Sequence, residues 1–105
     1  MIRITPPPLR ITLPRVAWGS RVERERRNRI RLAVYAYAYE LRDESLVTDH
    51  EFDQLARIID PTVTTGNPVL DQFFRDHYQP DSGMWIHQHP ALDGITNIYH
   101  RYYIQ

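Results

Sequence analysis

The chain has 105 residues, of which 42% are hydrophobic and 25% charged, a composition typical of one small soluble globular domain. It contains no cysteine, which excludes disulfides and thiolate chemistry. It also has no apolar run of the length that a signal peptide or a membrane span requires. We therefore expect a cytoplasmic protein with no membrane partner.

The net charge is zero, but it is distributed unevenly along the chain. Residues 1–31 hold nine arginines against two acids, whereas residues 32–105 hold four arginines against eleven acids. All thirteen Lys or Arg positions are arginine, so the chain has no lysine amine that could form a Schiff base or another covalent lysine intermediate.

Residues 1–19 are predicted to form an extended arm. Its prolines, including three in a row at residues 6–8, exclude helix and favour polyproline or edge-strand geometry. Apolar residues alternate, or nearly so, with polar ones, so the arm should not remain solvated. Packing over its own domain and docking on a partner are the favoured alternatives, and exchange between two copies of a homodimer is the third.

A long first helix is predicted next. Ser20 and Glu23 have the spacing of a capping box, so the helix should begin at about Arg21 and run to Leu41 or Arg42. Two tyrosines, Tyr35 and Tyr39, are expected on a stripe beside the core. The core face itself should carry Ile30, Val34, Ala38 and Leu41.

The first half of this helix is strongly basic. Clustered arginine is the electrostatic footprint of nucleic-acid binding, and it equally suits an acidic protein surface. The alternative is a solvated face whose arginines pair with Glu23, Glu25 and acids elsewhere in the chain. The candidate partner-binding residues are Arg21, Arg24, Arg26, Arg27, Arg29 and Arg31.

A second helix should follow a short connection. Thr48 and Glu51 form a second capping box, which starts the helix at about Asp49, and Asp60-Pro61 ends it. The residues expected at its apolar positions are Phe52, Leu55, Ala56, Ile58 and Ile59. Asp49 and Asp53 are four residues apart and share a face. Together with the tyrosines of the first helix they could bind a flat, hydroxylated ligand, although two packed helices often bury such rings against each other.

Residues 28–60 resemble the N-terminal helical domain Ia of bacterial NAD-dependent DNA ligases. That family carries a Tyr-His pair and, nine residues after the His, an Asp-x-x-Tyr-Asp pattern; this chain has Tyr39, Glu40, Asp49, Phe52 and Asp53 in the same register. The resemblance implies that Tyr39 and Phe52 flank a nicotinamide ring and that the two aspartates accept hydrogen bonds from ribose hydroxyls. The chain departs from the pattern at two positions, where Glu40 replaces His and Phe52 replaces Tyr.

The resemblance implies a free-standing module that binds NAD or nicotinamide mononucleotide. The chain cannot be a ligase by itself, because it has no lysine to carry the adenylyl group. No nucleophile–base pair or metal set is apparent, so we predict no enzyme activity. An accessory protein of a virus or mobile element, such as a phage protein, fits this description. The alternative function is an interaction protein, DNA-binding or protein-binding, that uses residues 21–31 and the arm.

Residues 61–105 should add two further helices. Asn67 followed by Pro68 predicts the start of one, which carries Val69, Leu70, Phe73, Phe74 and Tyr78 and ends before Pro80. The other should run from about Pro90 to Ile104, weakened at Gly94, with Leu92, Ile95, Ile98, Tyr99 and Tyr102 on one face.

Between these helices, residues 84–90 are predicted to be a strand-like or irregular piece over the core. An extended segment would place His87 and His89 on one side, but two imidazoles make a weak metal site, and we favour His89 as a cap ahead of Pro90. The predicted architecture is all-α, a small bundle of about four helices with a proline-rich N-terminal arm.

Overall fold

The computed structural model describes residues 18–103, so most of the predicted arm, with its alternatives of packing, docking or exchange, lies outside the described residues. Within this range the chain forms four α-helices and one short 3₁₀ helix and no strand, which confirms the all-α class. The elements are α1 (Arg21–Arg42), α2 (Asp49–Ile58), α3 (Pro68–His77), η1 (Met84–Gln88) and α4 (Leu92–Tyr103).

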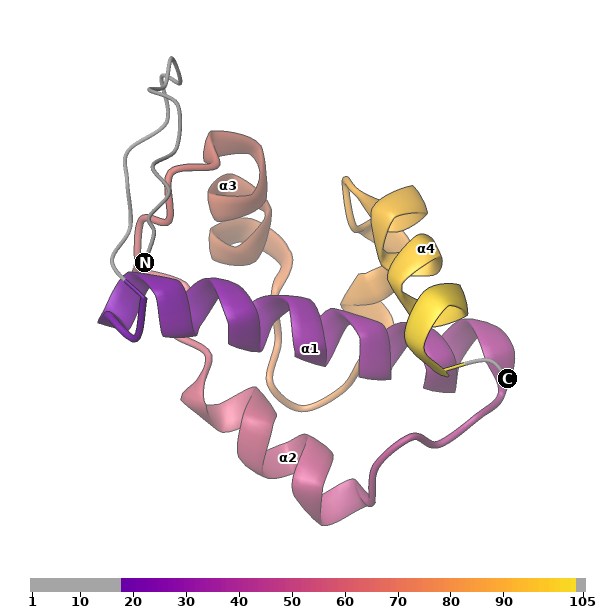
Figure 1. Ribbon diagram of the computed structural model, residues 1–105. Helices are drawn as coiled ribbons and strands as arrows, with labels where there is room; N and C mark the ends of the chain where they lie inside the picture. Colours follow the sequence, from indigo (N-terminus) through magenta and orange to yellow (C-terminus); the bar gives the residue numbers. More distant parts are fainter. Residues whose placement is uncertain (1–17, 104–105) are drawn as a thin grey trace, which may run out of the picture.

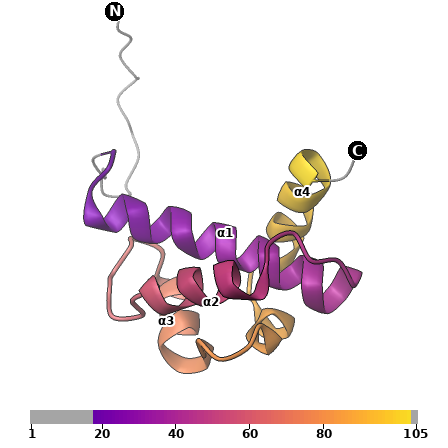
Figure 2. The ribbon, with the colours of Figure 1, turned by 90° about the horizontal axis from the view of Figure 1, so that it is seen from below.

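Helix α1 is the central element of the fold. It runs across the molecule with α2 on one side and α3 and α4 on the other (Figure 1), and it contacts α2, η1 and α4. In the view of Figure 2, α3 and α4 lie to different sides of α1, so the long helix is covered from several directions. For this reason its middle turns are buried almost all round: Leu32, Ala33, Val34, Ala36, Tyr37 and Ala38.

The predicted helix starts are confirmed by their capping bonds. The Ser20 hydroxyl accepts the N–H of Glu23 at 3.2 Å, and Thr48 and Glu51 form both bonds of a capping box. The Asn67 side chain accepts the N–H of Leu70 at 3.1 Å. Each of these bonds joins residues that are three apart in the chain, which is why the sequence alone predicts the helix starts correctly.

The predicted core was wrong at several apolar positions. In α1, Val34 and Ala38 are buried as expected, but Ile30 is 45% and Leu41 39% exposed. Leu41 lies in the last turn of the helix, whereas Ile30 lies near its middle and lines an open pocket between α1, α3 and α4. Three further apolar residues on the shorter helices face solvent rather than the core: Ile58, Val69 and Tyr102.

The segment predicted as strand-like or irregular is the 3₁₀ helix η1. It packs against α1 and α4, and the described residues offer no strand with which it could pair. Trp85 and Ile86 are buried in the core, as the prediction of a covering piece required. The two histidines do not share a side, since His87 is exposed while His89 is buried and its Nδ1 accepts the N–H of Ala91 at 3.0 Å in the turn before α4.

Candidate ligand-binding site

A pocket of about 410 Å³ opens where the C-terminal half of α1 meets the start of α2. Its lining includes all five residues of the predicted nucleotide site: Tyr39, Glu40, Asp49, Phe52 and Asp53. The pocket is large enough for a nucleoside-sized ligand, given the usual range of roughly 300–1,000 Å³ for small-molecule sites. The sequence thus predicted a set of residues that the fold brings to one place.

Local chain geometry holds the two helices in this arrangement. Helix α1 ends at Arg42, and its C-cap Asp43 adopts a left-handed conformation with φ of 56°. The Glu44 N–H then bonds the Ala38 carbonyl at 2.9 Å. The chain turns back, and the capping box at Thr48 starts α2 beside the helix it has just left. Asp49, Phe52 and Asp53 are at positions i, i+3 and i+4 of α2, so they share the side of the helix that lines the pocket.

One part of the pocket wall is aromatic and apolar. Tyr35 and Phe52 are half-buried, whereas Tyr39 is 59% exposed and its ring can cover a ligand that enters. Leu46 and Val47, from the connection between α1 and α2, complete this wall. A planar ring would fit against such side chains, since aromatic pairs favour stacked or edge-to-face contact.

Another part of the wall comes from a loop whose position beside the pocket could not be predicted from the sequence. Residues 80–83 reach the pocket from the segment between α3 and η1. A Cβ on Gly83 would lie 3.1 Å from the Ala36 Cβ and 3.6 Å from the Phe52 Cζ, so glycine lets this loop approach both helices closely. The sequence Asp81-Ser82-Gly83 is typical of a turn, but nothing local indicates where such a turn packs.

The polar part of the lining is acidic. Beside the serines Ser45 and Ser82 it contains four carboxylates: Glu40, Asp49, Asp53 and Asp81. Asp53 accepts a hydrogen bond from the Arg57 Nε at 2.9 Å, and the Nε2 of His87 lies 3.8 Å from a Glu40 oxygen. Carboxylate oxygens accept hydrogen bonds, so this arrangement suits a ligand that carries hydroxyl donors.

Comparison of the chain with protein-family models, with curated proteins and with solved structures finds no match. Among residues 18–103, no group of three or more metal-ligating side chains comes together, and no helix is both long and apolar enough to cross a membrane.

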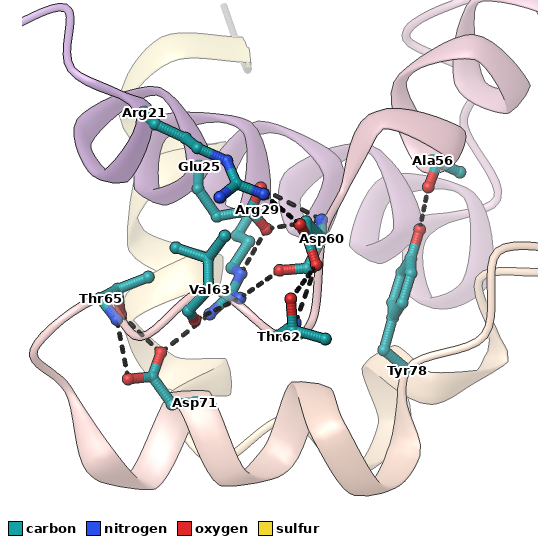
Figure 3. Close-up of polar contacts among 10 residues, drawn as sticks. All are labelled: Arg21, Glu25, Arg29, Ala56, Asp60, Thr62, Val63, Thr65, Asp71 and Tyr78. Atoms are coloured by element: carbon teal, nitrogen blue, oxygen red, sulfur yellow. Dashed lines mark hydrogen bonds and ion pairs between the residues drawn. The ribbon is translucent and has the colours of Figure 1, made fainter.

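The predicted basic surface contains one arginine that is buried. Arg29 is 5% exposed, and its guanidinium bonds the carboxylates of Glu25 at 2.7 Å and Asp71 at 2.9 Å (Figure 3). It also bonds the backbone carbonyls of Asp60 at 2.9 Å and Val63 at 3.1 Å. Arg29 therefore joins α1 to α3 and to the segment between α2 and α3, and it cannot contribute to a partner surface.

The acids around Arg29 are themselves held by the same segment. Glu25 accepts the Asp60 N–H at 3.0 Å, and Asp71 accepts the N–H of Thr65 at 2.9 Å and its hydroxyl at 2.6 Å. Burial raises the pKa of the Asp71 carboxyl, but the bonds from Thr65 and Arg29 outweigh it and hold that pKa below its ordinary value. Asp71 is thus charged when it faces Arg29.

The remaining arginines divide into two groups. The Arg26 Nε donates to the Thr65 carbonyl at 2.8 Å, so this half-buried side chain also supports the α2–α3 segment. The other four are exposed at intervals of three or four residues along one side of α1: Arg21, Arg24, Arg27 and Arg31. Arg21 pairs with Asp60, and the Arg27 guanidinium lies 3.6 Å from Glu23 and 5.0 Å from the Trp18 ring. The alternative of internal ion pairs thus accounts for part of the basic half.

Proposed function

We propose that the protein is a small binding module whose pocket between α1 and α2 holds a nicotinamide nucleotide or a related ligand with a flat ring and ribose hydroxyls. The observation that supports this best is that all five residues of the ligase-like pattern line one pocket. In this proposal the ring lies against Tyr39 and Phe52, and the hydroxyls donate to Asp49 and Asp53.

Titration calorimetry with NAD, nicotinamide mononucleotide and nicotinamide riboside tests the proposal. We expect saturable binding of at least one of the three, weakened about ten- to a hundredfold in Asp49→Asn, because a hydrogen bond to a charged group contributes about 1.5–3 kcal/mol. Asp93→Asn is the matched control, since Asp93 also lies in the first turn of a helix but outside the pocket. Absence of heat at millimolar ligand would refute the proposal.

A second candidate function rests on the exposed stripe of Arg21, Arg24, Arg27 and Arg31. Four cations on one side of a helix can follow a phosphate backbone, so we propose nucleic acid as the partner of this surface. Binding measured by anisotropy with labelled DNA should fall steeply with salt and weaken in Arg24→Gln/Arg31→Gln. The double variant Arg75→Gln/Arg101→Gln, which removes exposed arginines of α3 and α4, should bind as the natural chain does. Binding that is equal in both variants would exclude the stripe.

An accessory role in a virus or mobile element, a cytoplasmic location and the lack of an enzyme activity belong to the same proposal. The accessory role is supported by the resemblance, and the lack of ligase activity by the absence of lysine, which leaves no residue for an adenylyl-lysine.

A further inference from the structure

The charge of the pocket bears on which ligand it can hold. Four carboxylates line it, and the described residues of the lining include no Arg or His. Two of these acids contact basic side chains outside the lining: exposed Arg57 bonds Asp53 at 2.9 Å, and exposed His87 lies 3.8 Å from Glu40. Even with Arg57 counted, the pocket is strongly negative, so it should repel a phosphate and attract a cation.

The end of α1 and the start of α2, which meet at the pocket, both favour a positively charged ligand. Tyr39 and Glu40 lie in the last turn of α1, where the helix dipole is negative. The start of α2 would ordinarily attract an anion, but the chain supplies its own: the Glu51 carboxylate accepts the Thr48 N–H at 2.9 Å, and the Thr48 hydroxyl accepts the Glu51 N–H at 3.0 Å. A ligand phosphate at this helix start would therefore meet the carboxylates of Asp49 and Glu51, which both lie in the first turn of α2.

The aromatic residues add a preference for a charged ring. The side chains of Tyr35, Tyr39 and Phe52 line the same pocket as the carboxylates. An aromatic face attracts a cation through its quadrupole, and the attraction grows when the cation is withdrawn from water. A ring that is both flat and positively charged gains from stacking and from the carboxylates at once.

We propose that the pocket selects a cationic ribonucleoside without a phosphate, of which nicotinamide riboside is the representative. This rests on the proposed function and narrows it, because a mononucleotide would place a phosphate among these acids. The pyridinium lies between the rings, the ribose hydroxyls donate to Asp49 and Asp53, and Glu40 stands where the resembled ligases carry a histidine and disfavours the phosphorylated ligand.

The test compares three ligands by titration calorimetry: nicotinamide riboside, nicotinamide mononucleotide, and reduced nicotinamide riboside, which has the same groups but a neutral ring. We expect the cationic riboside to bind about tenfold or more tighter than either of the others, as unit charges at short range predict for a partly screened site. In Glu40→Gln the preference for the riboside over the mononucleotide should shrink, whereas Asp93→Asn should leave it unchanged. Circular dichroism checks that both variants fold.

The outcomes separate this inference from the function on which it rests. Binding of the mononucleotide as tight as that of the riboside, or an unchanged preference in folded Glu40→Gln, would overturn the inference and leave the proposed function intact. Equal binding of the oxidised and reduced ribosides would also overturn it, because ring charge would then play no part. Failure of all three ligands and NAD to bind would overturn both.

Discussion

At the scale of single residues, Arg29 is the side chain on which most of the polar interior depends. Replacing it with Met leaves the Glu25 and Asp71 carboxylates buried without their counter-charge. We expect the free energy of unfolding to fall by about 3–5 kcal/mol, as for other buried pairs that lose one partner. Urea denaturation of Arg29→Met measures this change.

Arg27→Met is the matched control for this substitution. Arg27 lies two residues away in the same helix, but its side chain is 43% exposed and its nearest acid is 3.6 Å away. Exposed pairs of this kind contribute about 0–1 kcal/mol, so the control should unfold close to the natural chain. Equal losses in the two variants would mean that the buried network is not what stabilises the α2–α3 segment.

His89 should make stability depend on pH. Burial lowers the pKa of this imidazole to about 4, whereas in the unfolded chain it is about 6.5. Between these values the unfolded chain binds a proton that the folded chain does not, so stability should fall as pH is lowered through this window. Denaturant midpoints from pH 7 to pH 4 should show a shallower fall in His89→Asn, whose amide can still accept the Ala91 N–H.

His50→Asn serves as the comparison for that pH series, since His50 is exposed on α2. It should keep the slope of the natural chain. A slope that His89→Asn leaves unchanged would show that other groups carry the pH dependence.

At the scale of elements, close contact between the 80–83 loop and two helices shapes the pocket. Gly83 has an ordinary φ of −102°, so the obstacle to a larger residue there is steric: a Cβ would lie 3.1 Å from that of Ala36. Gly83→Ala should cost about 1–3 kcal/mol through overpacking against Ala36, and it should weaken ligand binding by moving the 80–83 loop away from α1. Thermal denaturation and calorimetry measure the two effects.

Gly94→Ala is the contrasting substitution. Gly94 lies inside α4 and a Cβ there would meet nothing within 4 Å. Alanine is the better helix former by about 0.8–1 kcal/mol, so this variant should be more stable than the natural chain. Stabilisation by Gly83→Ala as well would contradict the close packing of the loop.

At the scale of the whole molecule, the fold brings some basic residues from the first part of the sequence into contact with acidic residues from the later part. The basic half of α1 pairs with acids from the α2–α3 segment and α3, while the acids near the other end of α1 line the pocket. The fold also leaves an exposed arginine stripe on the N-terminal half of α1 and an acidic pocket beside its C-terminal half. This separation is the reason that two different partners are proposed for one small domain.

Three hydrogen-bonded carboxylates outside the pocket predict how the molecule responds to acid. Bonds from Thr48 lower the pKa of Glu51, bonds from Thr62 lower that of Asp60, and bonds from Thr65 and Arg29 overcome burial to lower that of Asp71. A lowered pKa contributes stability that is complete above the unfolded value of about 4 and is lost as pH falls through the folded value. The melting temperature of the natural chain should therefore decrease when the pH is lowered below 4. The decrease from the value at pH 7 should be smaller in Asp71→Asn. An unchanged melting temperature at pH 2.5 would refute this.

The sequence by itself determined the helices and the two-helix part of the pocket. Caps at Ser20, Thr48 and Asn67 join residues three apart, and the five pocket residues lie on consecutive helices, so both are local properties of the chain. Only the tertiary structure decided that Arg29 is buried against Asp71, 42 residues away, and that residues 80–83 close the pocket. It also decided which apolar residues are covered, because periodicity gives the face of a helix but not the neighbours that pack on it.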